Sequence, residues 1–184
     1  GRAKITVPGI EGLKYELNYS HIYNTGNINS FHNNNTPQGV SNRGLARKEP
    51  SESRDWIVNN IVTYSKEFGD HQLNSTFLFS REGRTGSSST LTSQAIDNQA
   101  LGYNNMGLGT IVTVASSAYE ENSLSYMARV NYSFLSKYMI TATVRRDGFS
   151  GFAPGNKWAT FPSASLAWVA SDESFLQNSG LYLK

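Results

Sequence analysis

The chain has 184 residues, of which 38% are hydrophobic and 12% aromatic, and its formal net charge is +2. This charge is too small to indicate a nucleic-acid partner, and the absence of cysteine excludes a disulfide framework and thiolate metal sites. No apolar run approaches the ~20 residues that a membrane-spanning helix needs. The chain opens GRAKITVPGI and ends LYLK, without an initiator Met or an apolar leader, so we expect a segment of a longer protein.

Six stretches alternate between apolar and polar residues, which is the pattern of β-strands with two unlike faces. In chain order the strands are predicted at about 12–23, 55–66, 71–81, 123–134, 138–146 and 161–170. Leu181–Lys184 would begin a seventh strand. The fold class is therefore predicted to be all-β.

The alternation is clearest in residues 123–134 and, after a turn at 135–137, in residues 138–146. Even positions of the first stretch carry Leu124, Tyr126, Ala128, Val130, Tyr132 and Phe134. Odd positions carry mostly polar residues. Strands of this length with one apolar face are typical of a transmembrane β-barrel, which turns apolar side chains to lipid and polar side chains to the lumen.

The gaps between the predicted strands differ systematically in length. Long, Gly- and Asn-containing loops are expected at about 24–53, 82–122 and 147–160, and short turns at 67–70, 135–137 and 171–180. Long and short gaps alternate, as they do in outer-membrane barrels with long extracellular loops and short periplasmic turns. We therefore expect an antiparallel up-and-down barrel with these three loops outside the cell.

Charged residues within the predicted spans follow the same division. Lys14, Glu16, Arg129 and Arg145 lie on the polar, lumen-facing phase, whereas a charge on the lipid face near the midplane would cost ~2–4 kcal/mol. Arg146 has the lipid-facing phase but lies at a strand end, where its head can reach the interface. Six or seven strands leave two open edges, so we expect an arc of a larger barrel.

Aromatic residues fall into two groups. Those near strand ends are predicted to form a girdle at the membrane interfaces, although they could also stack on a ligand: Trp56, Tyr64, Tyr126, Tyr138 and Trp168. Those in the predicted extracellular loops are candidates for substrate binding, with packing inside the loop as the alternative: Tyr103, Tyr119, Phe149, Phe152 and Trp158.

Residues 125–176 resemble a signature region of the SusC/RagA-like TonB-dependent outer-membrane transporters. The matching pieces include Arg129–Tyr132, Thr141–Gly148 and Phe161–Ser163. The earlier segment Phe68–Leu73 resembles a turn between adjacent strands of that family. The resemblance is specific over residues 125–176 and diffuse elsewhere.

The resemblance implies a barrel of 22 strands plugged by an N-terminal domain. It also implies import of oligosaccharides or peptides, a SusD-like surface lipoprotein over the barrel, and energy delivered through TonB. An integral outer-membrane location, with the wall against lipid and lipopolysaccharide, follows from the same family. The plug, the TonB box and the N-terminal extension do not occur in these residues, and the family implies no cofactor and no enzymatic activity.

Two alternatives remain open from the sequence. A soluble β-sandwich adhesin or interaction module would pack two sheets around a hydrophobic core. An outer-membrane enzyme would need a serine close to His21 or His71. The three histidines, which include His32, have no metal-ligand spacing, so no metal site is predicted.

Overall fold

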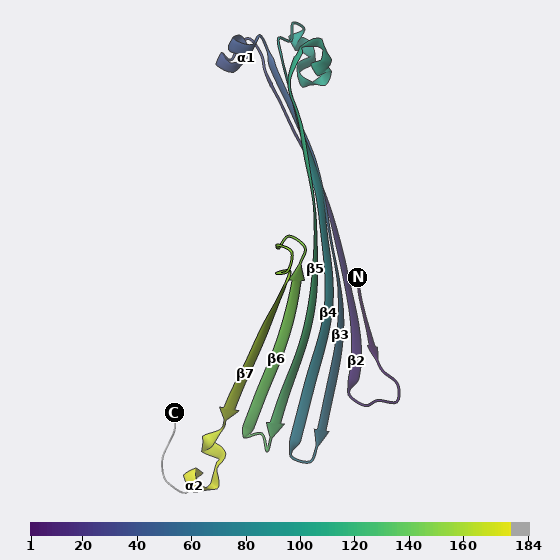
Figure 1. Cartoon of the computed structure of the whole chain (residues 1–184), viewed down its shortest axis with the longest axis vertical. Helices are drawn as coiled ribbons and strands as arrows, with labels where there is room; N and C mark the ends of the chain where they lie inside the picture. The colour runs from purple at the N-terminus through teal and green to yellow at the C-terminus, as the bar shows by residue number, and fades with distance from the viewer. Residues whose placement is uncertain (178–184) are drawn as a thin grey trace. The chain divides into compact units, whose positions relative to one another are not determined.

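The computed structural model describes residues 1–177, which form one seven-stranded sheet with the strands in chain order (Figure 1). The strands are β1 Arg2–Thr6, β2 Leu13–His32, β3 Leu45–Phe68, β4 His71–Gln94, β5 Thr110–Phe134, β6 Tyr138–Phe149 and β7 Trp158–Trp168. Pairing is antiparallel between β1 and β2, β5 and β6, and β6 and β7. The all-β, antiparallel prediction is confirmed.

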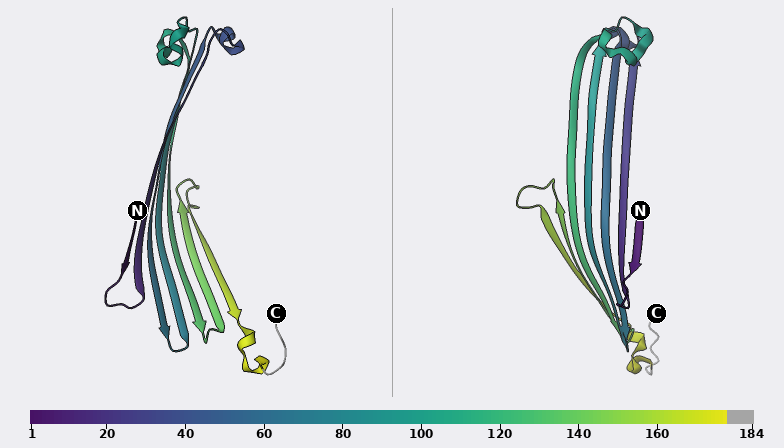
Figure 2. Two further views of the ribbon diagram at one scale, coloured as in Figure 1. Left: turned by 180° about the vertical axis from the view of Figure 1, so that it is seen from behind. Right: turned by 90° about the vertical axis from the view of Figure 1, so that its right-hand side faces the viewer.

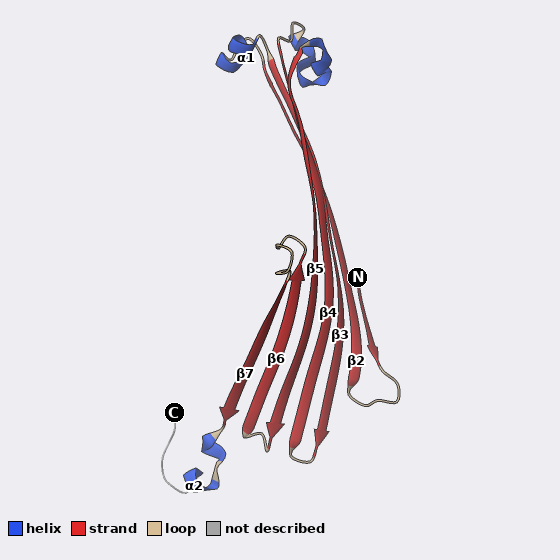
Figure 3. Cartoon of the chain, viewed as in Figure 1, coloured by secondary structure: helices blue, strands red, loops and turns tan. Residues whose placement is uncertain are grey.

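In the described part of the chain, helices occur between β2 and β3, between β4 and β5, and after β7 (Figure 3). They are α1 Pro37–Asn42, η1 Gln99–Leu108, η2 Ala170–Asp172 and α2 Ser174–Gln177, of which η1 and η2 are 3-10 helices. Within residues 1–177, no helix is both long and apolar enough to cross a membrane.

The chain divides into two compact units, and each contains parts of several strands. The first unit comprises residues 1–20, 57–82 and the chain from Asn122 onward. The second unit comprises residues 21–56 and 83–121. Strands β2 to β5 contribute to both units. Figure 2 shows these long strands side by side in two views.

The register of β5, β6 and β7 produces the two predicted faces in the first unit. Ala128 lies opposite Val144, which in turn lies opposite Pro162. On the other face, Arg129 lies opposite Thr143, which lies opposite Ser163. Because successive strand residues point to opposite sides, apolar residues gather on one face and polar residues on the other.

The apolar face is not covered by any other part of the described chain. Val130, Val144 and Leu166 expose 38%, 46% and 80% of their surface. The buried hydrophobic residues within residues 1–176 are Ala46 and Ile96, both in the second unit. A sandwich would need two packed sheets and a dry core, and the described residues form neither.

Several strands extend further than the sequence predicted. Most of the expected loops at about 24–53 and 82–122 is strand, so that the connections shrink to residues 33–44 and 95–109. These segments are rich in Asn, Ser, Thr and Gly, which sequence patterns assign to loops, but pairing with neighbouring strands overrides weak strand propensity. The loop at about 147–160 likewise shortens to 150–157.

Other predicted boundaries differ less. Strand β1 was missed because its five residues, RAKIT, alternate between polar and apolar types over only a short stretch. The turns expected at 67–70 and 135–137 are found at 69–70 and 135–137. The predicted strand start at Leu181–Lys184 lies outside the described residues. Connections at alternate strand ends still differ in length, as the sequence indicated, while their cellular sides stay a prediction.

A glycine determines how the β1–β2 turn meets its neighbour. Gly12 has a φ of +82°, which side-chain-bearing residues rarely adopt, and a Cβ there would overlap the carbonyl oxygen of Ser65. The amide of Ser65 also donates a hydrogen bond of 3.0 Å to the Gly12 carbonyl oxygen. Gly9, in the same turn, has a φ of +80° but no atom within 4 Å of such a Cβ.

We therefore expect Gly12→Ala to destabilise the intact protein more than Gly9→Ala. Both variants incur about 1–2 kcal/mol of backbone strain, but only the first also forces the carbonyl of Ser65 to move. Unfolding in urea, followed by heat-modifiable gel migration, measures the difference. Equal midpoints for the two variants would show that the close approach to Ser65 contributes nothing to stability.

Candidate functional site

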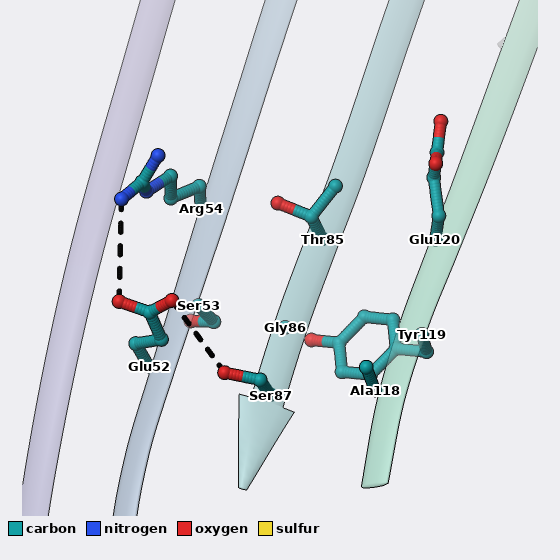
Figure 4. Close-up of a pocket in the computed structure, with 9 residues that line it drawn as sticks. All are labelled: Glu52, Ser53, Arg54, Thr85, Gly86, Ser87, Ala118, Tyr119 and Glu120. Atoms are coloured by element: carbon teal, nitrogen blue, oxygen red, sulfur yellow. Dashed lines mark hydrogen bonds and ion pairs between the residues drawn. The ribbon is translucent and has the colours of Figure 1, made fainter.

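The second unit carries a charged surface on one face of β2, β3 and β4. The hydroxyl of Tyr23 donates to Glu52 at 3.1 Å, and the guanidinium of Arg54 lies 5.2 Å from the centre of the Tyr23 ring. Glu52 also faces Arg54 at 4.0 Å and accepts from Ser87 at 3.5 Å. Figure 4 shows Glu52, Arg54 and Ser87, which line an open hollow of about 420 Å³ together with Glu120.

The opposite face of the same strands carries hydroxyl groups and one exposed ring, and we call it the hydroxyl surface. Gly86 precedes Ser87, so it points to the other side of β4. The ring of Tyr119 lies on Gly86, where a Cβ would come within 2.5 Å of the ring carbon Cε1. The hydroxyls of Ser88 and Ser117 lie 3.0 Å apart beside it.

A second hollow, of about 440 Å³, opens at the hydroxyl surface. Asn24, Ser51 and Ser53 line it together with Tyr119, which is 52% exposed. The amide of Asn24 donates to the Ser53 hydroxyl at 3.3 Å. An exposed ring among hydroxyls and amides suits a ligand that alternates apolar patches with hydrogen-bonding groups, such as a sugar or a peptide backbone.

Two of the candidates predicted in loops lie in strands instead, Tyr119 in β5 and Phe149 at the end of β6. The candidates other than Tyr119 have different surroundings. Tyr103 lies in η1, and the Lys48 ammonium lies 5.6 Å from its ring centre. Phe149 and Phe152 pack edge to face with ring centres 5.3 Å apart, which favours local packing, although Phe152 remains 56% exposed. Neither arrangement offers a ring bordered by hydroxyl groups as Tyr119 does.

Trp158 is not in a loop as the sequence predicted, because it is the first residue of β7. Its ring covers Gly148, where a Cβ would come within 2.9 Å. It stacks with Tyr126 at 6.1 Å between ring centres, and the guanidinium of Arg146 lies 5.0 Å from its centre. Trp158 thus shares the apolar face with the residues predicted to form the girdle.

Comparisons with known proteins identify relatives of the chain, although no family model matches it. It is 31% identical over 171 residues to the TonB-dependent receptor P3 of Formosa agariphila, covering 92% of the chain and 17% of the relative. It is 47% identical over 55 residues to the TonB-dependent receptor SusC of Bacteroides thetaiotaomicron, covering 30% of the chain and 6% of that protein.

The chain also matches solved structures. A structure of the RagAB peptide transporter superposes with a TM-score of 0.84 at 22% identity, over 97% of this chain and 20% of the other. This chain is part of a SusC/RagA-like TonB-dependent receptor. It spans about 17% of the length of the first curated relatives it matches. These receptors are integral outer-membrane β-barrels and transporters rather than enzymes, which agrees with the location and the non-enzymatic role expected from the sequence.

Three of the four charged residues predicted to face the lumen of the receptor form polar contacts. Glu16 pairs with Arg2 at 2.7 Å, and Arg145 pairs with Asp147 at 2.8 Å. The Nε of Arg129 donates to the Thr143 hydroxyl at 3.1 Å. Lys14 lines a hollow beside the β3–β4 turn. The sequence did not indicate these partners, and their lumenal position stays a prediction.

The predicted girdle residues of the receptor occupy several strands. The ring of Trp56 covers Gly83, where a Cβ would come within 2.5 Å of the indole nitrogen. Tyr126 contacts Phe79 with ring centres 5.3 Å apart. Tyr64 lies in β3 and is partly buried. Their position at the membrane interfaces stays a prediction.

The histidine alternative gains no support from the contacts of His71. Its Nδ1 lies 2.6 Å from the Tyr132 hydroxyl, and its ring stacks on Phe68 and Phe134 with centres 5.0 and 4.8 Å apart. This is an aromatic cluster rather than a Ser–His pair. Within residues 1–177, no group of His, Cys, Asp or Glu is placed to hold a metal ion.

A carboxylate outside the strands joins two of the residues predicted to form the girdle. Glu173 accepts hydrogen bonds from the Tyr138 hydroxyl at 2.5 Å and the Trp168 indole at 3.1 Å. The Lys137 ammonium lies 3.9 Å away. The hydrogen bond from Tyr138, followed by that from Trp168, holds the pKa of Glu173 below its usual range.

The stability that Glu173 contributes should depend on pH. A carboxyl whose folded pKa is lowered stabilises the fold above its unfolded pKa and loses this contribution as pH falls through the folded pKa. We expect Glu173→Gln to lower the melting temperature of the receptor at neutral pH, with a smaller difference in acid. Thermal melts across this pH range, with Asp172→Asn as the control, measure it. A difference that does not change with pH would contradict the carboxylate role.

Proposed function

We propose that this chain forms part of the wall and of the extracellular extension of a barrel that imports large nutrients, either oligosaccharides or peptides. The observation that carries the proposal is the first unit, where an uncovered apolar face backs directly onto a hydrogen-bonded polar face. Such a sheet suits lipid on one side and an aqueous lumen on the other. The matched RagAB structure is described as a peptide transporter.

The strand lengths support an extension beyond the membrane. A tilted transmembrane strand needs about 9–11 residues. Strands β6 and β7 have 12 and 11 residues, whereas β3 and β5 have 24 and 25. Most of the additional residues are polar and all belong to the second unit, although Ile111, Val112 and Val114 of β5 are exposed apolar residues. We infer that the residues of the second unit lie in water, where its hydroxyl surface meets substrate.

Two further partners belong to the proposal. By analogy with the RagAB assembly, a SusD-like lipoprotein closes over the extracellular side. TonB supplies energy through regions of the receptor other than these residues. Neither partner contributes chemistry to the chain, whose role is to form the wall and to select among substrates.

Single cysteines test the proposed orientation, because the chain has none of its own. We expect Asn156→Cys, in the connection 150–157, to react on intact cells with a maleimide too large to cross the outer membrane. Asp70→Cys, in the turn 69–70, should react only after the outer membrane is permeabilised. The experiment uses the intact receptor with any other cysteine removed. The reverse pattern of labelling would invert the proposed topology.

Tyr119 tests the substrate-binding role of the hydroxyl surface. Stacking on an aromatic ring contributes about 1 kcal/mol, so Tyr119→Ala should raise the half-saturating substrate concentration roughly fivefold. Tyr119→Phe retains the ring and should stay near wild type, and Tyr103→Ala serves as the control.

The substrate class is tested in the same cells. A tryptic peptide pool and a mixed oligosaccharide pool are supplied separately, and mass spectrometry identifies what accumulates in the periplasm. If one pool accumulates only when the receptor and TonB are both present, the result supports import and identifies the substrate class. Accumulation that is independent of the receptor would overturn the proposed function. Unchanged uptake in Tyr119→Ala would remove only the role of the hydroxyl surface.

A further inference from the structure

An apolar groove crosses the uncovered face of the first unit. It encloses about 400 Å³ between strands β3, β4, β5 and β6. Its lining is almost wholly apolar and includes Val62, Phe77, Phe79, Ala128 and Val144. Phe77 is 52% exposed and Val144 46% exposed, so the groove is open along the face. A flexible hydrocarbon chain matches this lining better than a compact polar ligand does.

One end of the groove carries a cation. Arg146 lines the groove, and within β6 and β7, both fully described, it is the one charged residue on the apolar face. Among residues 1–177 it forms no ion pair, and its guanidinium lies over the Trp158 ring. Trp158 is itself held by Gly148 beneath it and Tyr126 beside it. The aromatic cluster therefore orients a positive charge that has no counter-ion among residues 1–177.

The depth of Arg146 in the membrane follows from its energy cost. A cation on the lipid face costs ~2–4 kcal/mol at the midplane but only ~0–1 kcal/mol near an interface. Tyr126 and Trp158 are also residue types that favour interfaces. Arg146 therefore marks the headgroup level, at the end of β6 that leads into the connection 150–157. Arg81, two residues beyond Phe79 in β4, adds a second cation on the same face.

The groove and the cation have separate roles. Lipid chains are as apolar as the groove, so the groove positions a chain but gives it little preference over bulk lipid. Preference must come from the headgroup, where a guanidinium binds phosphate oxygens through charge-assisted hydrogen bonds. The proposed orientation places this end of β6 at the extracellular side of the membrane.

We propose that Arg146 and the adjoining groove form a binding site for a phosphorylated outer-leaflet glycolipid of the lipid A type. One acyl chain lies along Phe77, Ala128 and Val144, and a headgroup phosphate meets Arg146 beside Trp158. The site belongs to the outer surface of the barrel wall and is distinct from the proposed substrate surface of the second unit.

Lipid binding to the intact receptor in detergent tests the proposal, with native mass spectrometry as the readout. The probes are diphosphorylated lipid A and the same lipid without its phosphates. We expect the wild type to prefer the phosphorylated form, and Arg146→Gln to weaken its binding about tenfold, which equals about 1.4 kcal/mol, and to abolish the preference. Arg129→Gln, on the opposite face, should leave the binding of both lipids unchanged.

Filling the groove provides a second, independent variant. Ala128→Phe should weaken the binding of both lipids, because the larger side chain obstructs the acyl chain and not the phosphate contact. Heat-modifiable gel migration confirms that each variant is folded. Equal affinity of the wild type for both lipids, or unchanged binding in Arg146→Gln, would overturn the site. Recovery of a lipoprotein acyl chain in the groove would overturn the assignment of its occupant.

Discussion

The structure depends on one requirement, which is that each strand must satisfy its backbone hydrogen bonds through its neighbours. Within residues 1–177 every strand pairs with the strands adjacent in sequence, and almost no hydrophobic core forms. In lipid no water is available to replace a missing partner. The ladder of backbone bonds therefore carries the fold, and side chains decide what each face contacts. β1 and β7 each keep one edge that further strands of a barrel would pair.

Once the backbone is paired, the two faces are free to differ. In the first unit they divide into apolar and polar, whereas in the second unit both are largely polar, one charged around Glu52 and Arg54 and the other bearing hydroxyls around Tyr119. The same strands thus change their surroundings along their length without changing secondary structure. A binding surface can arise on such strands through side-chain substitutions alone, because the paired backbone and the loops do not have to change.

The alternation of apolar and polar residues predicted those strands that have one apolar and one polar face. Residues 123–146 display two unlike faces around a tight turn, and the structure has both the turn and the register. Alternation could not find the polar ends of β2 to β5, since a strand with polar residues on both faces has no period to detect. It indicated Tyr119 as an exposed aromatic residue but not Gly86 beneath it, because residues 33 positions apart are brought together only by strand pairing. Glu52 and Arg54 were missed for the same reason.

Three of the aromatic side chains lie on glycines of a neighbouring strand: Trp56 on Gly83, Tyr119 on Gly86 and Trp158 on Gly148. In each pair the ring lies flat because the facing position has no side chain. A methyl group added at the glycine would tilt the ring and change the surface presented to a sugar, a peptide or a lipid. The orientation of these aromatic side chains is therefore set by the facing glycines, which themselves contact no ligand. Substitutions at the glycine and at the aromatic residue of each pair should consequently be coupled in evolution, because the residue at one position limits which residues the other position can accept.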